Sequence, residues 1–414
     1  MYGLTPKSME DFMSEQIKWA INTMPHTEDK QLQVMHLNEI KKARKFHESF
    51  PQYQKTPLRK LPIMANYLGV QELFVKDESY RFGLNAFKVL GGSFAIAKYI
   101  AKQLHKDISE LPYGMLTSEK LKEELGQTTF FTATDGNHGR GVAWAANKLG
   151  QKAVVFMPKG STLTRLGNIR KEGASVTIEE VNYDACVRMA AEEASKVPNG
   201  VVVQDTAWEG YEEIPAWIMQ GYGTMAMEAD EQFVETAGAA PTHVIVQAGV
   251  GSLAGAVQGY FANRYPDNPP IIIIVEASEA ACLYKGANKG DGEIQIVDGD
   301  MPTIMAGLAC GEPNTISWDI LRNHAKVFLS CPDWVTIKGM RMLAAPIKGD
   351  PSITSGESGA LPFGALASVL LDDTYIPLKE ALQLNKDSRV LCFSTEGNTD
   401  PERYRNIVWE GLDQ

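Results

Sequence analysis

A regular alternation of short apolar segments with longer amphipathic ones begins at Thr128, and few folds accommodate it. The expected strands are 128–133, 153–157, 174–178 and 201–204, and the expected helices are 138–149, 163–172 and 184–196. Short strands separated by helices are typical of parallel βαβ units. This part of the chain therefore predicts an α/β domain with a largely parallel sheet.

A second series of the same kind follows. Its strands are apolar almost throughout, as in sheets whose two faces are covered by helices, and they are expected at 243–247, 271–275, 327–329 and 390–393. A chain of 414 residues also exceeds one typical domain. We expect two three-layer α/β domains with a ligand cleft between them at the carboxyl ends of the strands. The large domain is predicted from residues 1–90 plus 206–414 and the small domain from 91–205, with a surface insertion at 103–126.

Charge and hydropathy exclude several classes of partner. The sequence holds 40 basic and 51 acidic residues, a net charge of -11, and no basic run, which argues against nucleic acid and anionic membranes. Its longest strongly apolar stretch, 271–275, is far shorter than the roughly 20 residues of a membrane-spanning helix. Residues 1–17 show neither an apolar signal core nor a basic transit pattern, so the cytoplasm is the expected compartment.

Cysteine spacing fits neither a zinc site nor a disulfide framework. The five cysteines lie far apart and are Cys186, Cys282, Cys310, Cys331 and Cys392. We expect reduced cysteines that pack in the core, and no metal. A bridge between Cys282 and Cys310 is left open by the sequence.

A glycine-rich turn follows the apolar strand at 243–247. Gly249 and Gly251 allow the backbone of 249–253 to bend, so that successive N–H groups and the start of the next helix point at one anion. A bound phosphate fits such a turn, although tight turns need glycine for structural reasons as well. The turn lacks the Gly-Lys-Ser/Thr of a nucleotide P-loop, so a nucleotide is the poorer interpretation.

A second strand-to-helix turn, at 132–141, is rich in side-chain donors and acceptors. Asn137 can hydrogen-bond a ligand hydroxyl or oxyanion, while Gly136 and Gly139 permit a close approach. The competing interpretation is an Asp-Gly turn with a helix cap. His138 is expected to be a structural hydrogen-bonding group rather than a base.

Lys88 lies just inside a predicted helix, between Phe87 and Val89. Apolar neighbours are unusual for a fully solvated lysine, and partial burial would lower the pKa of its amine toward imine chemistry. A surface lysine with a buried stem is the alternative.

A further turn, after the strand at 390–393, carries Ser394 and Thr395. A hydroxyl at this position could bond a heteroaromatic nitrogen. It could equally cap the turn.

These four motifs occur in the order found in the fold type II, tryptophan-synthase-β-like, pyridoxal-phosphate (PLP) enzymes, and the similarity spans about residues 50–400. The first motif, Asn-Ala-Phe-Lys, ends at Lys88, and the second, Asp-Gly-Asn-His-Gly, ends at Gly139. The third is the glycine-rich turn at Gly249, and the fourth, Ser-Thr-Glu-Gly-Asn, ends at Asn398. Serine/threonine dehydratases read Ser-Phe-Lys-x-Arg-Gly and Ser-Gly-Asn-His-Gly instead. The run from Arg81, Arg-Phe-x-Leu-Asn-Ala-Phe-Lys-x-Leu-Gly, resembles the diaminopropionate ammonia-lyase family.

The resemblance implies a role for each motif. Lys88 would form the Schiff base with PLP, and Asn137 would hold the 3′-oxygen of the cofactor. Ser394 or Thr395 would face the pyridine nitrogen. The phosphate would be bound by the backbone of Gly249, Val250, Gly251, Ser252 and Leu253. The resemblance also implies a homodimer.

Two aspartates narrow the substrate. Asp135 stands where the relatives usually have a hydroxyl, and a carboxylate can pair with or deprotonate an amine on the substrate Cβ. Asp205, at a strand end, is a second candidate for this task, although both aspartates could instead cap turns. We therefore predict α,β-elimination of 2,3-diaminopropionate to pyruvate and two ammonia, with PLP as the electron sink. We hypothesise that Lys88 serves the L-isomer and Asp135 the D-isomer.

Two other functions stay open. Within the enzymes, the closest alternative is a serine/threonine dehydratase or a β-replacement enzyme. From a different class, the chain could be a binding protein with the PLP fold and no turnover. The retention of Lys88 together with the three ligand motifs disfavours that second alternative.

Overall fold

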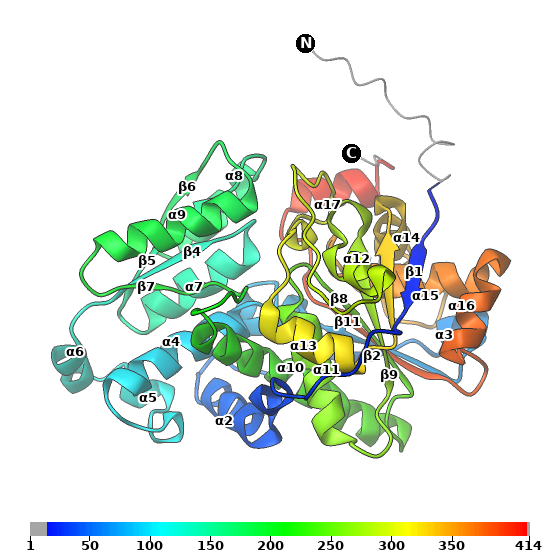
Figure 1. Ribbon diagram of the computed structural model, residues 1–414, viewed down its shortest axis with the longest axis horizontal. Helices are drawn as coiled ribbons and strands as arrows, with labels where there is room; N and C mark the ends of the chain where they lie inside the picture. The colour runs from blue at the N-terminus through cyan, green and yellow to red at the C-terminus, as the bar shows by residue number, and fades with distance from the viewer. Residues whose placement is uncertain (1–14, 412–414) are drawn as a thin grey trace, which may run out of the picture.

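The computed structural model describes residues 15–411 and contains two separate sheets, one of four strands and one of seven (Figure 1). The expectation about a signal or transit pattern concerned residues 1–17. Of these, residues 1–14 lie outside the described residues. The expected architecture of two α/β units with largely parallel sheets is confirmed.

The smaller sheet has the strand order β6-β5-β4-β7, and every pair in it is parallel. Its strands are β4 (Thr129–Ala133), β5 (Lys152–Met157), β6 (Ser175–Ile178) and β7 (Gly200–Val202). The helices between them are α7 (Asn137–Lys148), α8 (Leu163–Lys171) and α9 (Tyr183–Lys196). All seven elements were predicted, and the largest difference is that β7 ends at Val202 rather than at Gln204.

Alternating side chains of this sheet pack against helices on opposite faces. Phe130 and Val155 lie in one core with residues of α7, whereas Phe131 packs with Ala190 and Ala194 of α9. Successive residues of a strand point to opposite faces, so near-continuous apolar strands are needed when both faces are covered.

The larger sheet has the order β1-β10-β9-β8-β11-β3-β2. Its two edge strands, β1 (Lys18–Ile21) and β2 (Leu58–Lys60), are antiparallel to their neighbours. The parallel strands between them are β3 (Glu72–Asp77), β8 (His243–Gln247), β9 (Ile271–Ala277), β10 (Val327–Cys331) and β11 (Arg389–Ser394). The sequence predicted β8 to β11 but not the first three strands, because β1 and β2 are very short and β3 includes three charged residues.

Helices also cover both faces of the larger sheet. One layer contains α10 (Glu213–Ala237), α11 (Ser252–Arg264) and α13 (Thr315–His324), and the other contains α3 (Pro62–Leu68), α14 (Asp333–Ala344), α15 (Leu361–Leu371) and α16 (Ile376–Leu382). The remaining α-helices are α2 (Leu37–Glu48), α4 (Val89–Gln103), α5 (Tyr113–Leu116), α6 (Glu119–Leu125), α12 (Cys282–Lys289) and α17 (Pro401–Val408). The predicted insertion at 103–126 holds α5 and α6.

Helix α4 joins the two halves of the molecule, because it packs against α10 on one side and α7 on the other (Figure 1). A Cβ added at Gly141 of α7 would lie 2.8 Å from the Cα of Val89, so glycine is required for this close approach. The start of α4 is thereby fixed between the two sheets, and Lys88 occupies its N-cap position.

The division of the chain into a large domain of residues 1–90 plus 206–414 and a small domain of residues 91–205 stays a prediction. Within residues 15–411, no helix is long and apolar enough to cross a membrane.

Candidate active site

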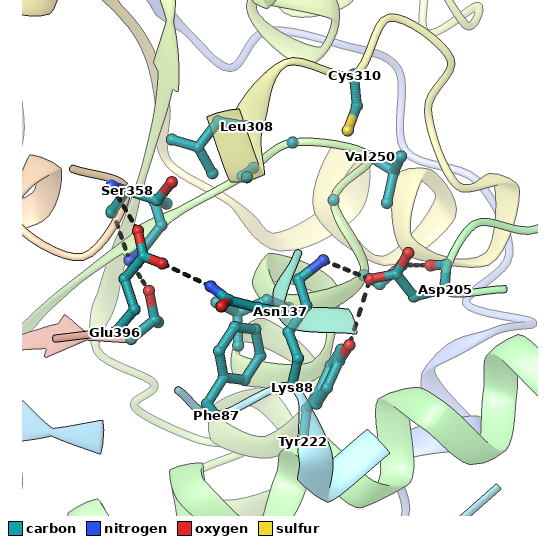
Figure 2. Close-up of a pocket in the computed structure, with 18 residues that line it drawn as sticks. Phe87, Lys88, Asn137, Asp205, Tyr222, Val250, Leu308, Cys310, Ser358 and Glu396 are labelled. Carbon is teal, nitrogen blue, oxygen red and sulfur yellow. Dashed lines mark hydrogen bonds and ion pairs between the residues drawn. The ribbon is translucent and has the colours of Figure 1, made fainter. Parts of the chain in front are cut away.

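A cavity lies where the motifs from the two sheets meet (Figure 2). The residues that line it are Phe87, Lys88, Asn137, Asp205, Tyr222, Gln247, Ala248, Gly249, Val250, Gly251, Ser252, Leu253, Gly307, Leu308, Cys310, Ser358, Thr395 and Glu396.

Lys88 reaches into this cavity and pairs with Asp205. Its Nζ donates to Asp205 Oδ2 at 2.6 Å, and the hydroxyl of Tyr222 donates to the same oxygen at 3.3 Å (Figure 2). Burial alone would lower the pKa of Lys88, but the Asp205 and Asp135 carboxylates raise it well above its ordinary value. The expectation of a lowered pKa was therefore wrong, since the sequence does not show which carboxylate faces the amine.

The turn that delivers Lys88 is held in an unusual backbone conformation. Phe82 and Asn85 have φ values of 49° and 61°, in the left-handed region that non-glycine residues rarely adopt. Asn85 Nδ2 donates to Asn398 Oδ1 at 3.1 Å, and the amide N–H of Phe87 donates to the carbonyl of Thr395 at 3.0 Å. The lysine turn and the turn after β11 therefore hold each other in place.

A buried ionic cluster lies beneath the same turn. The guanidinium of Arg81 contacts Glu78 at 2.8 Å and Glu228 of α10 at 2.7 Å, and the amine of Lys76 contacts Glu228 at 3.0 Å. The exposed side-chain fraction is 0% for all four residues. Two cations and two carboxylates satisfy one another here, which anchors the start of the lysine turn on α10.

The glycine-rich turn wraps one end of the cavity. Gly251 has φ +100° and caps α11, and the turn at 249–253, which includes the start of this helix, lines the cavity. A helix N-terminus is a favourable site for an anion. Ser252 Oγ donates to the carbonyl of Asp205, and Asn314 Nδ2 donates to Ser252 Oγ at 2.8 Å. The loop that would bind an anion is thus tied to the residue that holds Lys88.

Asn137 links the two sheets across the cavity. Its Nδ2 donates to Glu396 Oε2 at 2.5 Å, while the other carboxylate oxygen accepts the amide N–H of Ser358 at 3.0 Å (Figure 2). An amide nitrogen carries two N–H groups, so one remains to face a ligand.

The hydroxyls of Ser394, the last residue of β11, and of Thr395, the residue after it, differ in position. Thr395 lines the cavity and accepts from Gln247 Nε2 at 2.6 Å. Ser394 is not among the lining residues, and its hydroxyl donates to Ser355 Oγ at 2.7 Å. Neighbouring residues of an extended strand point to opposite sides, so only one of the pair can face the cavity.

Asp135 lines a neighbouring chamber rather than this cavity, and Arg165 Nη1 lies 3.6 Å from its Oδ2. His138 is buried and its Nε2 contacts the carbonyl oxygen of Val203 at 2.8 Å. Burial lowers the pKa of His138. This arrangement agrees with a structural rather than a basic histidine.

All five cysteines are buried free thiols. Cys310 lines the cavity, and the Cys282 thiol lies 3.7 Å from the carbonyl oxygen of Cys310. The expectation of reduced packing cysteines agrees with the structure, which has no Cys282 to Cys310 bridge.

Comparison with known proteins places this geometry in a family. The model of the family described as "Pyridoxal-phosphate dependent enzyme" matches residues 50–396. The diaminopropionate ammonia-lyase of Salmonella typhimurium is 50% identical over 402 residues, which cover 96% of this chain and 99% of the relative. The chain belongs to the diaminopropionate ammonia-lyase family of pyridoxal-phosphate dependent enzymes.

Solved structures agree with this assignment. The Escherichia coli diaminopropionate ammonia lyase in complex with D-serine superposes with a TM-score of 0.89 at 48% identity, covering 96% of this chain and 98% of that one. The same enzyme in complex with an aminoacrylate-PLP azomethine reaction intermediate gives a TM-score of 0.86 with the same identity and coverage.

The cavity residues of this family member suit PLP. A buried amine, a glycine-rich turn at a helix N-terminus and an amide with a free N–H are the groups that an aldehyde, a phosphate and a phenolic oxygen need. Ser358 Oγ and Gln247 Oε1 also lack a hydrogen-bond partner within residues 15–411, and both residues line the cavity. Buried polar atoms without partners indicate a missing ligand or water.

Several lining residues were not predicted from the sequence. Tyr222 lies in the run Gln-Gly-Tyr-Gly-Thr at 220–224 of α10, outside the four motifs. Glu396 lies inside the fourth motif and was overlooked because a glutamate in a turn is usually solvated. Ser358 and Cys310 lie outside every motif, so only the tertiary fold brings them to the cavity.

Proposed function

We propose that this protein catalyses the α,β-elimination of 2,3-diaminopropionate, as the L-isomer and also the D-isomer, to pyruvate and two ammonia. The observation that carries the proposal is Lys88, held at 2.6 Å from Asp205 in a cavity that the glycine-rich turn also lines. The choice of substrate is supported by relatives that are 50% and 52% identical to this chain over 99% and 92% of their own length, both of which are diaminopropionate ammonia-lyases.

The cofactor would be held by groups already in place. Lys88 is the residue that would bond its aldehyde carbon, Asn137 would donate to its 3′-oxygen, and the backbone of 249–253 would bind its phosphate. Thr395, rather than Ser394, would face the ring nitrogen. When bound, PLP supplies the electron sink that stabilises negative charge at the substrate Cα.

Side chains of the protein would hold and transfer the protons of the reaction. Asp205 fixes the Lys88 amine by a short ion pair, and Tyr222 supports the same carboxylate oxygen. A neutral threonine hydroxyl that faced the ring nitrogen would leave the ring less fully protonated than a carboxylate would, and this would favour elimination over transamination. Asp135, at the edge of the adjoining chamber, offers a negative charge for the β-ammonium group of the substrate.

Relative rates on four amino acids test the proposal. Pyruvate or 2-oxobutyrate release from L- and D-diaminopropionate, L-serine and L-threonine would be measured with the PLP-loaded protein. We expect diaminopropionate to be the preferred substrate, because a hydroxyl substrate gives Asp135 no charge to pair with. Faster turnover of serine or threonine would support a dehydratase instead, and no turnover of any of them would support a binding protein.

Replacing each of the two aspartates separately by asparagine tests their roles. Asp135→Asn is expected to lower kcat/KM for the D-isomer by on the order of 10²-fold with a smaller loss for the L-isomer, the usual size of effect for a lost general base. Asp205→Asn should lower kcat/KM for the L-isomer at least as much as for the D-isomer, because it frees Lys88. Equal losses of kcat/KM for both isomers in Asp135→Asn would rule out the hypothesis that Lys88 serves the L-isomer and Asp135 the D-isomer.

We also propose that the protein works as a homodimer in the cytoplasm. The support is the resemblance to the diaminopropionate ammonia-lyase family. Sedimentation velocity of the PLP-loaded protein tests the assembly, since a monomer would contradict it.

A further inference from the structure

The chamber that Asp135 lines adjoins the catalytic cavity. Cys310 lines both spaces. Gly307 of the catalytic cavity lies beside Asp135, because a Cβ added at this glycine would be 3.6 Å from Asp135 Oδ2. The open space in the chamber is about 260 Å³. One water molecule in the liquid takes about 30 Å³, so the chamber has room for a small organic group that extends from a substrate in the cavity.

Arg165 of α8 also lines this chamber. Only 7% of its side chain is exposed, and its stem packs on the turn at Gly136, where an added Cβ would lie 3.1 Å from Arg165 Cδ. Its Nη1 lies 3.6 Å from Asp135 Oδ2, which is too far for a hydrogen bond. In the part of the chain that the structure describes, the backbone N–H of Arg165 donates to Thr162 Oγ1 but its guanidinium donates no hydrogen bond.

A buried guanidinium without an acceptor indicates a missing ligand, because buried polar groups are normally hydrogen-bonded. Arg403 and Lys159 line the same chamber, with 28% and 56% of their side chains exposed. Water screens these two charges more than it screens the charge of Arg165. Arg165 is therefore the best placed of the three cations to bind a carboxylate.

The charges of Asp135 and Arg165 together match those of an α-amino acid. A carboxylate and a guanidinium lie 3.6 Å apart on the wall of one chamber. The amine and the carboxylate of an α-amino acid are attached to one carbon, so both could be met at once, the amine by Asp135 and the carboxylate by Arg165. The β-nitrogen of diaminopropionate, assigned to Asp135 above, would be the amine of such a group.

We infer that the chamber is a subsite for an amino acid carried on the β-nitrogen of the substrate, and that the protein also eliminates this amino acid from β-N-substituted diaminopropionates. The inference rests on the proposed function. Lys88 takes the proton from Cα, the Cβ–N bond breaks, and its electron pair stays on the nitrogen of the leaving amino acid. Water hydrolyses the released aminoacrylate, so one substrate and one water give pyruvate, ammonia and the amino acid.

Two matched substrates test the inference. L-Diaminopropionate with a carboxymethyl group on its β-nitrogen would release glycine, and the carboxamidomethyl analogue, which has nearly the same shape without the charge, would release glycinamide. Both amines and pyruvate would be measured with the PLP-loaded protein. We expect kcat/KM for the carboxymethyl substrate to exceed that for the carboxamide by about 10-fold to 100-fold, the range for one hydrogen bond to a charged group.

Variants of Arg165 assign this preference to the guanidinium. In Arg165→Gln and in Arg165→Met, whose side chain still packs on Gly136, the ratio of the two kcat/KM values should fall to near unity. Arg165→Lys keeps the charge and should retain part of the preference. The ratio is taken within one protein, so a general loss of activity or of PLP cancels. Arg170→Gln, an exposed position on the same helix outside the chamber lining, should keep the full ratio.

A ratio near unity in the unaltered protein would overturn the inference, as would a ratio that Arg165→Gln and Arg165→Met both leave unchanged. Release of pyruvate from diaminopropionate without release of glycine from the carboxymethyl substrate would overturn the inference and leave the proposed function intact. If neither substrate gave pyruvate, the proposed function would fail together with the inference.

Discussion

Replacing Lys88 by alanine is expected to lower kcat/KM for diaminopropionate by on the order of 10³–10⁴-fold, within the upper range for a lost catalytic base and nucleophile. Lys88 is the one amine that lines the catalytic cavity within residues 15–411. The loss of kcat/KM should therefore be seen with both isomers of the substrate. The visible absorbance band of the lysine-bound cofactor should disappear in the same variant.

Lys102→Ala is a matched control for this experiment. Lys102 lies on the same helix, is 58% exposed and pairs with Glu213 at 2.6 Å, far from the cavity lining. It should keep both the absorbance band and the rate. A Lys88→Ala protein that retained more than a tenth of the rate would contradict the role given to Lys88.

Replacing Glu228 by alanine is expected to lower the free energy of unfolding by about 3–5 kcal/mol, the usual cost of removing one partner from a buried ion pair. The Glu228 carboxylate contacts Arg81 at 2.7 Å and Lys76 at 3.0 Å. Its removal leaves two buried cations with the single carboxylate of Glu78. Denaturant unfolding followed by circular dichroism would measure the change.

Glu231→Ala on the same helix serves as the control. The Glu231 side chain is 44% exposed and contacts Arg44 and Lys55, so its loss should cost less than about 1 kcal/mol. Similar losses in the two variants would show that the buried cluster does not hold the lysine turn as described.

Much of the fold could be predicted from hydrophobic periodicity. The strand at 243–247 was predicted with the bounds that β8 has, because it is apolar throughout and lies between turn residues. By contrast, β3 includes Glu72, Lys76 and Asp77, which leave an apolar run of only three residues, 73–75. Lys76 is nonetheless fully buried, since Glu228 from a distant helix neutralises it, and a local pattern carries no information on such a partner.

The candidate site was predictable to the extent that each motif lies on one turn. Lys88, Asn137, the 249–253 turn and Thr395 all line one cavity, as their shared family order implied. The pairing of Lys88 with Asp205 and the separate chamber of Asp135 depend on how the two sheets face each other. Hydrogen bonds between residues more than 100 positions apart follow from tertiary packing, so sequence spacing could not supply them.

The most direct test of the central claim is an absorbance titration of the purified, PLP-loaded protein with diaminopropionate, in parallel with Lys88→Ala. The account predicts a visible band in the unaltered protein that changes on adding substrate, while pyruvate is released at a rate that exceeds the rate from L-serine. Lys88→Ala should show neither the initial band nor the release. A band that is independent of Lys88, or a spectrum that diaminopropionate leaves unchanged, would contradict the account.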